Sequence, residues 1–412
     1  MAPSGPAILI LDHGGIGPRI ADARKLRGLT QQGLALLVPC SKSLVSQVER
    51  GCRPVTPWFV AAVARALHLG VTELTGQPYR GATERADRIH AAIPQLRVAL
   101  TYADVPPEPG VAPRRLGELR RDVTTVAGLL DRMDYLALGR RLPGLVEELS
   151  WVWHGSDGPA RREAAELLLS SYLAVKAVAY RLGYVDLVSV AIGHAARLAD
   201  EVGNPELLAL VAEERCQVFF ATGAHDAGTR FVRRAHRQFD SLIAGTESGL
   251  AITGSLQLRA AVLTARSGTG RSEAWDHLGH AREISERIGR ETNHHGLVFG
   301  PANVRIHEVA TAVELDDPDE AIRLAGDFEP PPGLPPERAS HHYLDLARAR
   351  LAAGQRGRAL DCLLRAERLA PQHARNHPMA RETTVALLRA QSRVPESLRS
   401  MARRMNLTPT GP

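Results

Sequence analysis

The segment from Thr30 to Gly51 contains two short helical patterns separated by a turn, and this spacing limits the possible folds more than any other feature. Thr30 is expected to cap the first helix, where Ala35 leaves room for a second helix to cross closely. A break at Pro39 ends that helix. Ser41 is then expected to cap the second helix, and Gly51 stands where a helix needs its C-terminal cap. The pattern predicts a helix-turn-helix, whose leading partner is double-stranded DNA.

The two expected helices have distinct inner and outer faces. Helical spacing directs inward the side chains of Leu34, Leu37, Val38, Leu44, Val45 and Val48. The helix after Ser41 directs outward the short polar side chains of Lys42, Ser43, Ser46 and Gln47. Polar side chains near the N-terminal end of a helix that fits the major groove can hydrogen-bond to base edges. The outer face of this helix is therefore the candidate surface for reading a DNA sequence.

Residues from Ile16 to Tyr79 resemble the Xre, or Cro/repressor-like, family of bacterial transcriptional regulators. The resemblance rests on a leading basic helix, a Thr-Gln helix start, a Ser-Lys-Ser helix start, the Val-Glu-Arg-Gly ending at Gly51 and an amphipathic helix from Thr56 to Leu67. It implies that Gln31 holds a DNA phosphate. Pro39 departs from the pattern, because the family usually has a glycine there and proline cannot adopt a positive φ. A helical hairpin without a DNA role is the alternative.

Pattern and resemblance together give ten candidate DNA-contacting residues. They are Arg27, Gln31, Gln32, Ser41, Lys42, Ser43, Ser46, Gln47, Arg50 and Arg53. We expect Arg27, Gln31 and Arg53 to hold phosphates, and the outward residues after Ser41 to contact bases. Glu49 is expected to pair with Arg24 or Arg27, because a partly buried carboxylate needs a partner.

The charge of the chain is unevenly distributed. The first 80 residues contain nine Lys or Arg and four Asp or Glu, whereas the whole chain contains 51 and 45. The other 332 residues therefore hold 42 basic and 41 acidic residues. Nearly all of the positive surplus lies in the expected DNA-binding domain, where it would neutralise phosphates.

Length and composition predict an all-α protein. A chain of 412 residues exceeds what one core usually serves, and its 4% of aromatic residues favours closely packed helices over strands. We expect a small five-helix helix-turn-helix DNA-binding domain followed by a tetratricopeptide-like α-solenoid. The four cysteines lack paired spacing, and no segment resembles a signal peptide or a membrane span. We expect a cytoplasmic protein that has no cofactor and no membrane association.

Residues 343–371 follow the tetratricopeptide pattern from Tyr343 to Pro371. Looser copies place the small residue of each second helix at Val188, Gly228, Ala274, Ala321 and Ala359. These positions are 40, 46, 47 and 38 residues apart, which exceeds the usual repeat of about 34 residues. The region is therefore expected to be tetratricopeptide-like, and an irregular helical bundle is the alternative.

The sequence predicts four segments. They are a flexible N-terminal arm in residues 1–15, the helix-turn-helix domain in 16–79, a connecting helix and Pro-rich linker in 80–113, and the helical domain in 114–408. This layout resembles the peptide-pheromone-responsive regulators of Gram-positive bacteria and the large Xre-type regulators of actinomycetes, and the Arg- and Ala-rich composition favours the second group. The resemblance implies a homodimer held by the helical domain and an effector, either a peptide or a small molecule.

The segment from Asn293 to His307 is the first candidate for an effector site. Pro301 is expected to start a helix that carries Asn303 and His307 four residues apart on one face. With Phe299, these two residues are the candidate ligand-binding residues. In the alternative, the segment shapes a turn and its polar side chains satisfy buried backbone groups.

Other chemistry has weaker support in the sequence. The histidines at 294, 295, 307, 341 and 342 raise the question of a metal site, but no thiolate or carboxylate completes a recognised spacing, so no metal is expected. No nucleophile and base are grouped, so no catalytic residue and no enzyme activity are expected. Cys40 would be a redox switch only if the helix N-terminus and Lys42 lowered its thiol pKa. A DNA-tethered scaffold that captures a protein partner is the alternative function.

Overall fold

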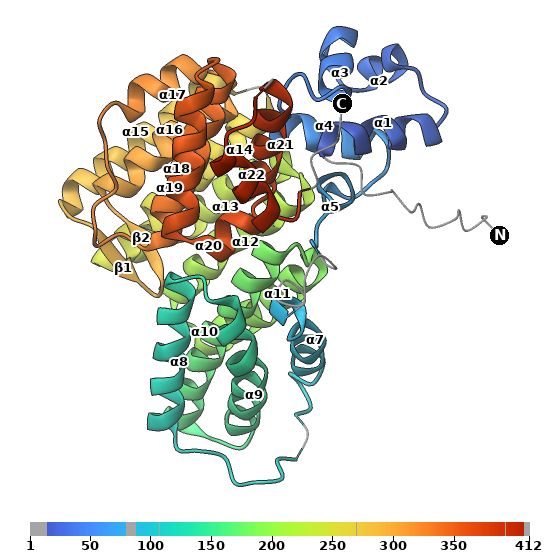
Figure 1. Ribbon diagram of the computed structural model, residues 1–412. Coiled ribbons are helices and arrows are strands. Elements are labelled where there is room, and N and C mark those ends of the chain that lie inside the picture. The colour runs from blue at the N-terminus through green and yellow to red at the C-terminus, as the bar shows by residue number, and fades with distance from the viewer. Residues whose placement is uncertain (1–14, 80–87, 107, 269, 392, 408–412) are drawn as a thin grey trace.

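As Figure 1 shows, the computed structural model describes residues 15–79, 88–106, 108–268, 270–391 and 393–407. Within these ranges the protein is all-α except for one two-stranded hairpin. The expected N-terminal arm lies outside the described ranges apart from Gly15. Within the described ranges, no helix combines the length and the apolarity that crossing a membrane requires.

A head of five helices begins the described chain. Its helices are α1 (Ile16–Leu26), α2 (Gln31–Leu37), α3 (Lys42–Glu49), α4 (Pro57–Ala66) and α5 (Val71–Thr75). The side chains of Thr30, Ser41 and Thr56 cap α2, α3 and α4, and each accepts a hydrogen bond from the backbone N–H three residues on, at 2.9, 3.1 and 3.3 Å. The two caps predicted from the sequence, at Thr30 and Ser41, are confirmed.

The inward positions of the head are confirmed with one exception. Leu34, Val38, Val45 and Val48 are buried in the core of the head, but Leu37 is 56% exposed. The reason is that α2 ends at Leu37 and the chain then turns inward, so that extended Val38 takes the core position. The sequence placed the end of this helix at Pro39, after Val38, whereas α2 ends at Leu37.

The rest of the described chain is a longer helical region. Its helices are α7 (Ile93–Thr101), α8 (Leu116–Asp131), α9 (Tyr135–His154), α10 (Gly158–Leu182), α11 (Val185–Val202), α12 (Pro205–Thr222), α13 (His225–Ile243), α14 (Glu247–Ser267), α15 (Arg271–Ile288), α16 (Pro301–Glu314), α17 (Pro318–Ala325), α18 (Pro336–Ala352), α19 (Arg356–Leu369), α20 (Pro371–Asn376), α21 (Pro378–Ala390) and α22 (Glu396–Arg404). From α10 to α19, each even-numbered helix packs along the odd-numbered helix that follows it. The region is a tetratricopeptide-like α-solenoid.

Small and compact residues let the paired helices approach. The positions predicted from the sequence lie on the second helix of each pair and are all buried, namely Val188, Gly228, Ala274, Ala321 and Ala359. At Gly228 an added Cβ would lie 2.9 Å from Phe219 Cβ in the paired helix α12 and 2.8 Å from Leu263 Cδ2 in α14. These residues confirm the positions of the helix pairs.

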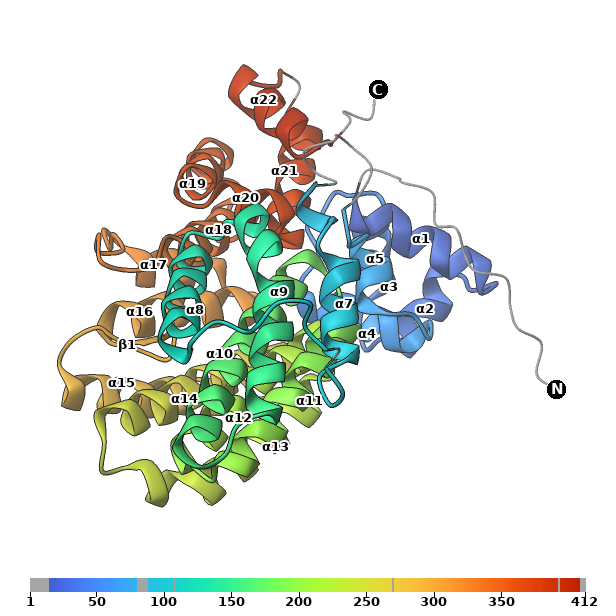
Figure 2. The ribbon, with the colours of Figure 1, turned by 90° about the horizontal axis from the view of Figure 1, so that it is seen from below.

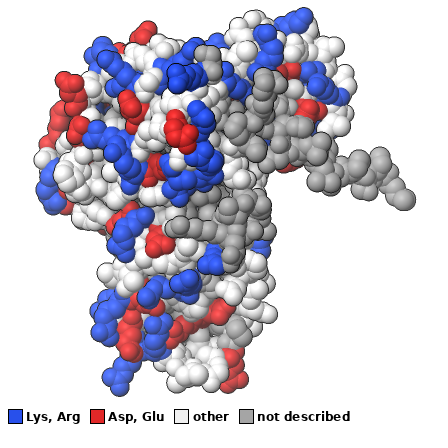
Figure 3. All heavy atoms as spheres, in the orientation of Figure 1, with Lys and Arg blue, Asp and Glu red and all other residues white. Residues whose placement is uncertain are grey.

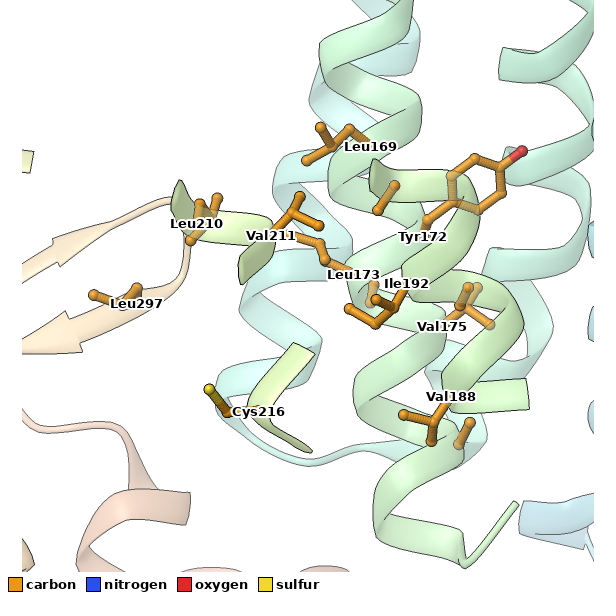
Figure 4. Packing of buried hydrophobic residues seen from close by; sticks show 14 of the residues in the cluster. Leu169, Tyr172, Leu173, Val175, Val188, Ile192, Leu210, Val211, Cys216 and Leu297 are labelled. Atoms are coloured by element: carbon orange, nitrogen blue, oxygen red, sulfur yellow. The ribbon is translucent and has the colours of Figure 1, made fainter. Parts of the chain in front are cut away.

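The largest hydrophobic cluster runs from α7 to α16. Figure 4 shows how Tyr172 of α10 and Val188 and Ile192 of α11 lie within it. Ile93 and Leu96 of α7 are fully buried in the same cluster. The segment expected only to connect the two domains therefore contributes a helix to the core.

A short hairpin precedes α16 and was not expected from the sequence. Its strands are β1 (Thr292–His294) and β2 (Leu297–Phe299), which pair antiparallel with Thr292 opposite Phe299. His295 and Gly296 both have positive φ, 54° and 79°, as a tight two-residue turn requires. Strands of three residues are too short to show an alternation of apolar and polar residues in the sequence. The helix start predicted at Pro301 is confirmed.

Candidate nucleic-acid interface

The turn between α2 and α3 accommodates Pro39 without a left-handed residue. Val38 has φ −108° and ψ 120°, the extended conformation that a residue before proline prefers. None of residues 38–41, which the structure describes, has a positive φ angle. At the other end of α3, Gly51 has φ 68° and its N–H donates to Val48 O at 2.8 Å. Both ends of the expected recognition helix are therefore defined by local backbone geometry.

A buried ion pair joins the three helices of the motif. Arg24 Nε and Nη2 of α1 donate to Glu49 Oε1 and Oε2 of α3 at 2.5 and 2.8 Å, and both side chains are buried. Arg24 Nη1 also donates to Leu29 O at 2.6 Å. The hydrogen bond with Glu49 raises the pKa of Arg24. The predicted pairing of Glu49 is confirmed, with Arg24 and not Arg27 as its partner.

Gln31 belongs to the same cluster. Its Nε2 donates to Glu49 Oε2 at 2.8 Å, so the carboxylate orients the amide that the sequence assigns to a DNA phosphate. The side chain is half-buried, and the hydrogen bond from Nε2 to Glu49 fixes the direction in which Oε1 of the same amide points. The phosphate contact of Gln31 stays a prediction.

The other predicted DNA contacts differ in accessibility along α3. Ser41, Lys42, Ser43 and Arg50 are exposed, whereas Ser46 and Gln47 are half-buried. Gln47 Nε2 donates to Ser43 Oγ at 3.3 Å within the helix. The N-terminal half of α3 therefore has the freer outer surface.

The C-terminal end of α3 lies beside the helical region. Arg53 Nη2 donates to Asp316 Oδ2 at 2.6 Å, and the two side chains are 45% and 56% exposed. The N–H of Ile16 donates to Glu382 Oε2 of α21 at 3.0 Å. Figures 1 and 2 both place the head next to α21. A groove of about 870 Å³ is lined by Gln47 and Arg53 of the head and by residues of these C-terminal helices.

These contacts between head and helical region could not be found from the sequence. Asp316 and Glu382 are 263 and 366 residues away from their partners in the head. No motif or periodicity connects such positions, and each carboxylate taken alone resembles an ordinary surface residue. Arg53, a predicted phosphate contact, is thus held by a carboxylate of its own chain.

Basic side chains of the head remain available for phosphates. Arg27 and Lys42 are exposed and make no ion pair with any residue that the structure describes, and the same is true of Lys25. Figure 3 shows basic side chains on the outer surface of the head, at the upper right, and mixed charges over the helical region. Part of the positive charge surplus counted in the sequence is therefore accessible on the surface of the head.

Cys40 does not have the properties of a redox switch. Burial raises the pKa of its thiol, so the thiolate that oxidation requires is disfavoured. The condition for a redox switch, a pKa lowered by Lys42 and the helix N-terminus, is therefore not met.

The candidate ligand residues near the hairpin are engaged within the fold. Phe299 is fully buried against Gly254, where an added Cβ would lie 2.1 Å from the ring. Asn303 Nδ2 donates to Val298 O at 2.7 Å, and His307 Nδ1 lies 2.9 Å from Asn303 O. These contacts match the alternative in which the polar side chains satisfy backbone groups. His307 also lines a cavity of about 70 Å³, and burial lowers its pKa to about 3.

Comparison with known proteins agrees with the geometry of the head. The family model described as a helix-turn-helix domain matches residues 16–75. No relative is found among the curated proteins. Among solved structures, the chain is similar to the crystal structure of Bacillus thuringiensis PlcR in complex with the peptide PapR7 and DNA. The two sequences are 14% identical, and the alignment covers 67% of this chain and 96% of that chain. The TM-score of 0.25 is too low to infer a shared arrangement. The N-terminal head is a helix-turn-helix domain.

Proposed function

We propose that this chain is a sequence-specific transcriptional regulator of the Xre, or Cro/repressor-like, type found in actinomycetes. It binds an inverted-repeat operator as a homodimer, and a peptide or small molecule bound by the helical region controls its affinity for DNA. The observation that carries the proposal is the helix α3, which exposes Lys42 and Ser43 at its N-terminal end while the buried pair of Arg24 and Glu49 fixes its orientation. A rigid helix with polar side chains at that end suits base readout.

Selection of bound DNA from a random pool tests the proposal. Two recognition helices that enter successive major grooves require half-sites whose centres are about 34 Å apart, so the selected sites should be inverted repeats with that spacing. Sedimentation of the protein alone should give the mass of two chains. Selection of unrelated sequences, or a monomer that binds a single half-site with full affinity, would contradict the proposal.

Substitutions on α3 separate base readout from phosphate binding. Gln47→Ala should relax the preference at one base position by about 1 to 3 kcal/mol. Arg53→Ala should weaken binding to all sequences alike. Arg140→Ala removes an exposed arginine of α9, far from the head, and serves as the control. Operator binding that is insensitive to combined replacement of Lys42, Ser43 and Gln47 would refute the assignment of α3 as the recognition helix.

A further inference from the structure

A cavity of about 140 Å³ lies where the head meets the helical region. The head contributes an apolar wall that includes Val60 and Ala61 of α4 and Val71 of α5. The helical region contributes the opposite wall, from helices between α10 and α21. An occupant of this cavity therefore contacts both parts of the protein at once.

Four histidines of the helical region line the cavity; His225 Nδ1 lies 3.0 Å from Arg266 O, and the other three gather together. His341 comes from α18, His373 from α20 and His377 from the N-terminal cap of α21. The centroids of their rings are 6.1 Å apart for His341 and His373, 5.3 Å for His341 and His377, and 5.5 Å for His373 and His377. Among the described residues, no three side chains are arranged to hold a metal ion.

Each of the three clustered histidines has a buried ring nitrogen without a hydrogen-bond partner in the protein. The atoms are His341 Nδ1, His373 Nε2 and His377 Nδ1. Asp345 Oδ2 lies 3.9 Å from His341 Nδ1, beyond hydrogen-bond distance. Buried polar atoms are normally paired, so three unpaired nitrogens among the residues that line one cavity leave this wall polar and unsatisfied within the protein.

The histidines are neutral and can donate hydrogen bonds. Burial lowers the pKa of His373 to about 3 and also lowers the pKa of His341 and His377. A neutral imidazole carries one N–H donor, and which nitrogen carries the proton adjusts to the partner offered. His373 is only 1% exposed, whereas 28% of the His341 side chain is accessible.

The charged side chains that line the cavity directly are basic. Arg181 and Arg266 line it, and no Asp or Glu does within the described part of the chain. Glu337 accepts a hydrogen bond from Arg181 Nη2, and Glu314 Oε1 lies 3.2 Å from Arg266 Nη2, but the Nε atoms of both arginines are buried without a partner. Unused donors therefore outnumber unused acceptors on this wall.

We propose that the cavity binds a small organic carboxylate with an apolar body the size of one ring. The carboxylate lies against the histidines and the two arginines, and the apolar body lies against Val60 and Phe220. One ring is the upper limit for the apolar body, since a cavity of about 150 Å³ accommodates benzene alone. A regulatory role for this site rests on the proposed function of the chain as a DNA-binding regulator.

Occupancy of the cavity stabilises the arrangement in which the head contacts the helical region, because the ligand needs both walls. In that arrangement Arg53 is paired with Asp316 and not with a phosphate. A ligand that binds one arrangement shifts the equilibrium toward it, and the two binding events are reciprocally coupled. The carboxylate therefore lowers the affinity of the protein for its operator.

Calorimetric titration of the full chain with benzoate tests the site. Benzoate should bind saturably at one site per chain, whereas benzamide, which lacks the charge, and acetate, which lacks the ring, should bind at least about tenfold more weakly. His373→Phe keeps a ring but removes the N–H donor, and should weaken benzoate by about tenfold or more. His373→Gln keeps a donor and should lose less, and His280→Asn on the exposed face of α15 should change nothing.

The outcomes separate this inference from the proposed function. Absence of saturable benzoate binding, or equal binding of benzamide, overturns the ligand class even if the operator is bound normally. Benzoate binding that leaves operator affinity unchanged overturns the regulatory role. If His373→Phe fails to fold by circular dichroism, His377→Phe provides the same comparison. Failure to bind any DNA sequence without benzoate would instead contradict the proposed function and leave the titration interpretable.

Discussion

Replacement of Glu49 tests whether the buried pair holds the helix-turn-helix together. Glu49→Ala removes both hydrogen bonds to Arg24 and the one to Gln31, and leaves the guanidinium of Arg24 buried. Breaking a buried ion pair by removing one partner costs about 3 to 5 kcal/mol. Arg24 keeps its bond to Leu29 O at 2.6 Å, so we expect the lower end of this range, about 3 kcal/mol.

Hydrogen exchange of the backbone amides measures this loss locally. A change of about 3 kcal/mol corresponds to a rise of roughly a hundredfold in the opening equilibrium, so protection of the amides in α1, α2 and α3 should fall by that factor. Amides in the core of α10 and α11 should keep their protection. Glu49→Gln keeps hydrogen-bonding atoms but loses the charge, so its amide protection should lie between that of the wild type and that of Glu49→Ala.

A double replacement separates the ion pair from simple loss of packing. Arg24→Met combined with Glu49→Met leaves no unpaired charge and should restore part of the protection lost in Glu49→Ala. Unchanged exchange and unchanged operator affinity in Glu49→Ala would refute the reasoning. The same conclusion would follow if the double variant were less protected than the sum of the two single variants predicts.

Three further changes have defined outcomes. Asp316→Asn should release Arg53 and raise operator affinity about two- to fivefold. The dependence of affinity on salt should steepen by about one ion, and an unchanged salt slope would contradict this prediction. Gly228→Ala should destabilise the protein by about 1 to 3 kcal/mol in denaturant unfolding, because its Cβ would meet α14, whereas Gly279→Ala, which meets nothing, should be neutral or stabilising. Ser41→Ala should cost the head about 1 kcal/mol through loss of the α3 cap, measured as faster amide exchange in its first turn.

The sequence predicted those features of the fold that depend on neighbouring residues. Thr30 and Ser41 cap helices because a hydroxyl can reach an N–H three residues on, and the small residues of the helix pairs recur because helices must approach closely. The Arg24 and Glu49 pair was predictable since both side chains lie on helices whose faces the sequence defines. Leu37 was predicted wrongly because its place depends on where α2 ends.

Features made by residues that are distant in the sequence could not be predicted. The three histidines of the cavity belong to α18, α20 and α21, and only folding brings their rings within 6.1 Å. The sequence marked His341 only as one of five histidines that raise the question of a metal site, and no motif connects it with His373 or His377. The wall that faces them comes from a different part of the chain, so no local pattern marks the site.

The hydrogen bond between the Ile16 N–H and Glu382 has a consequence for synthesis of the protein. The residue before α1, Gly15, has no side chain to cap this helix, so the carboxylate of α21 supplies the missing acceptor. The two residues are 366 positions apart, and at about 5 to 20 residues per second the ribosome needs roughly 20 to 70 seconds to make the chain between them. The N-terminus of α1 is therefore complete only after the ribosome has made α21.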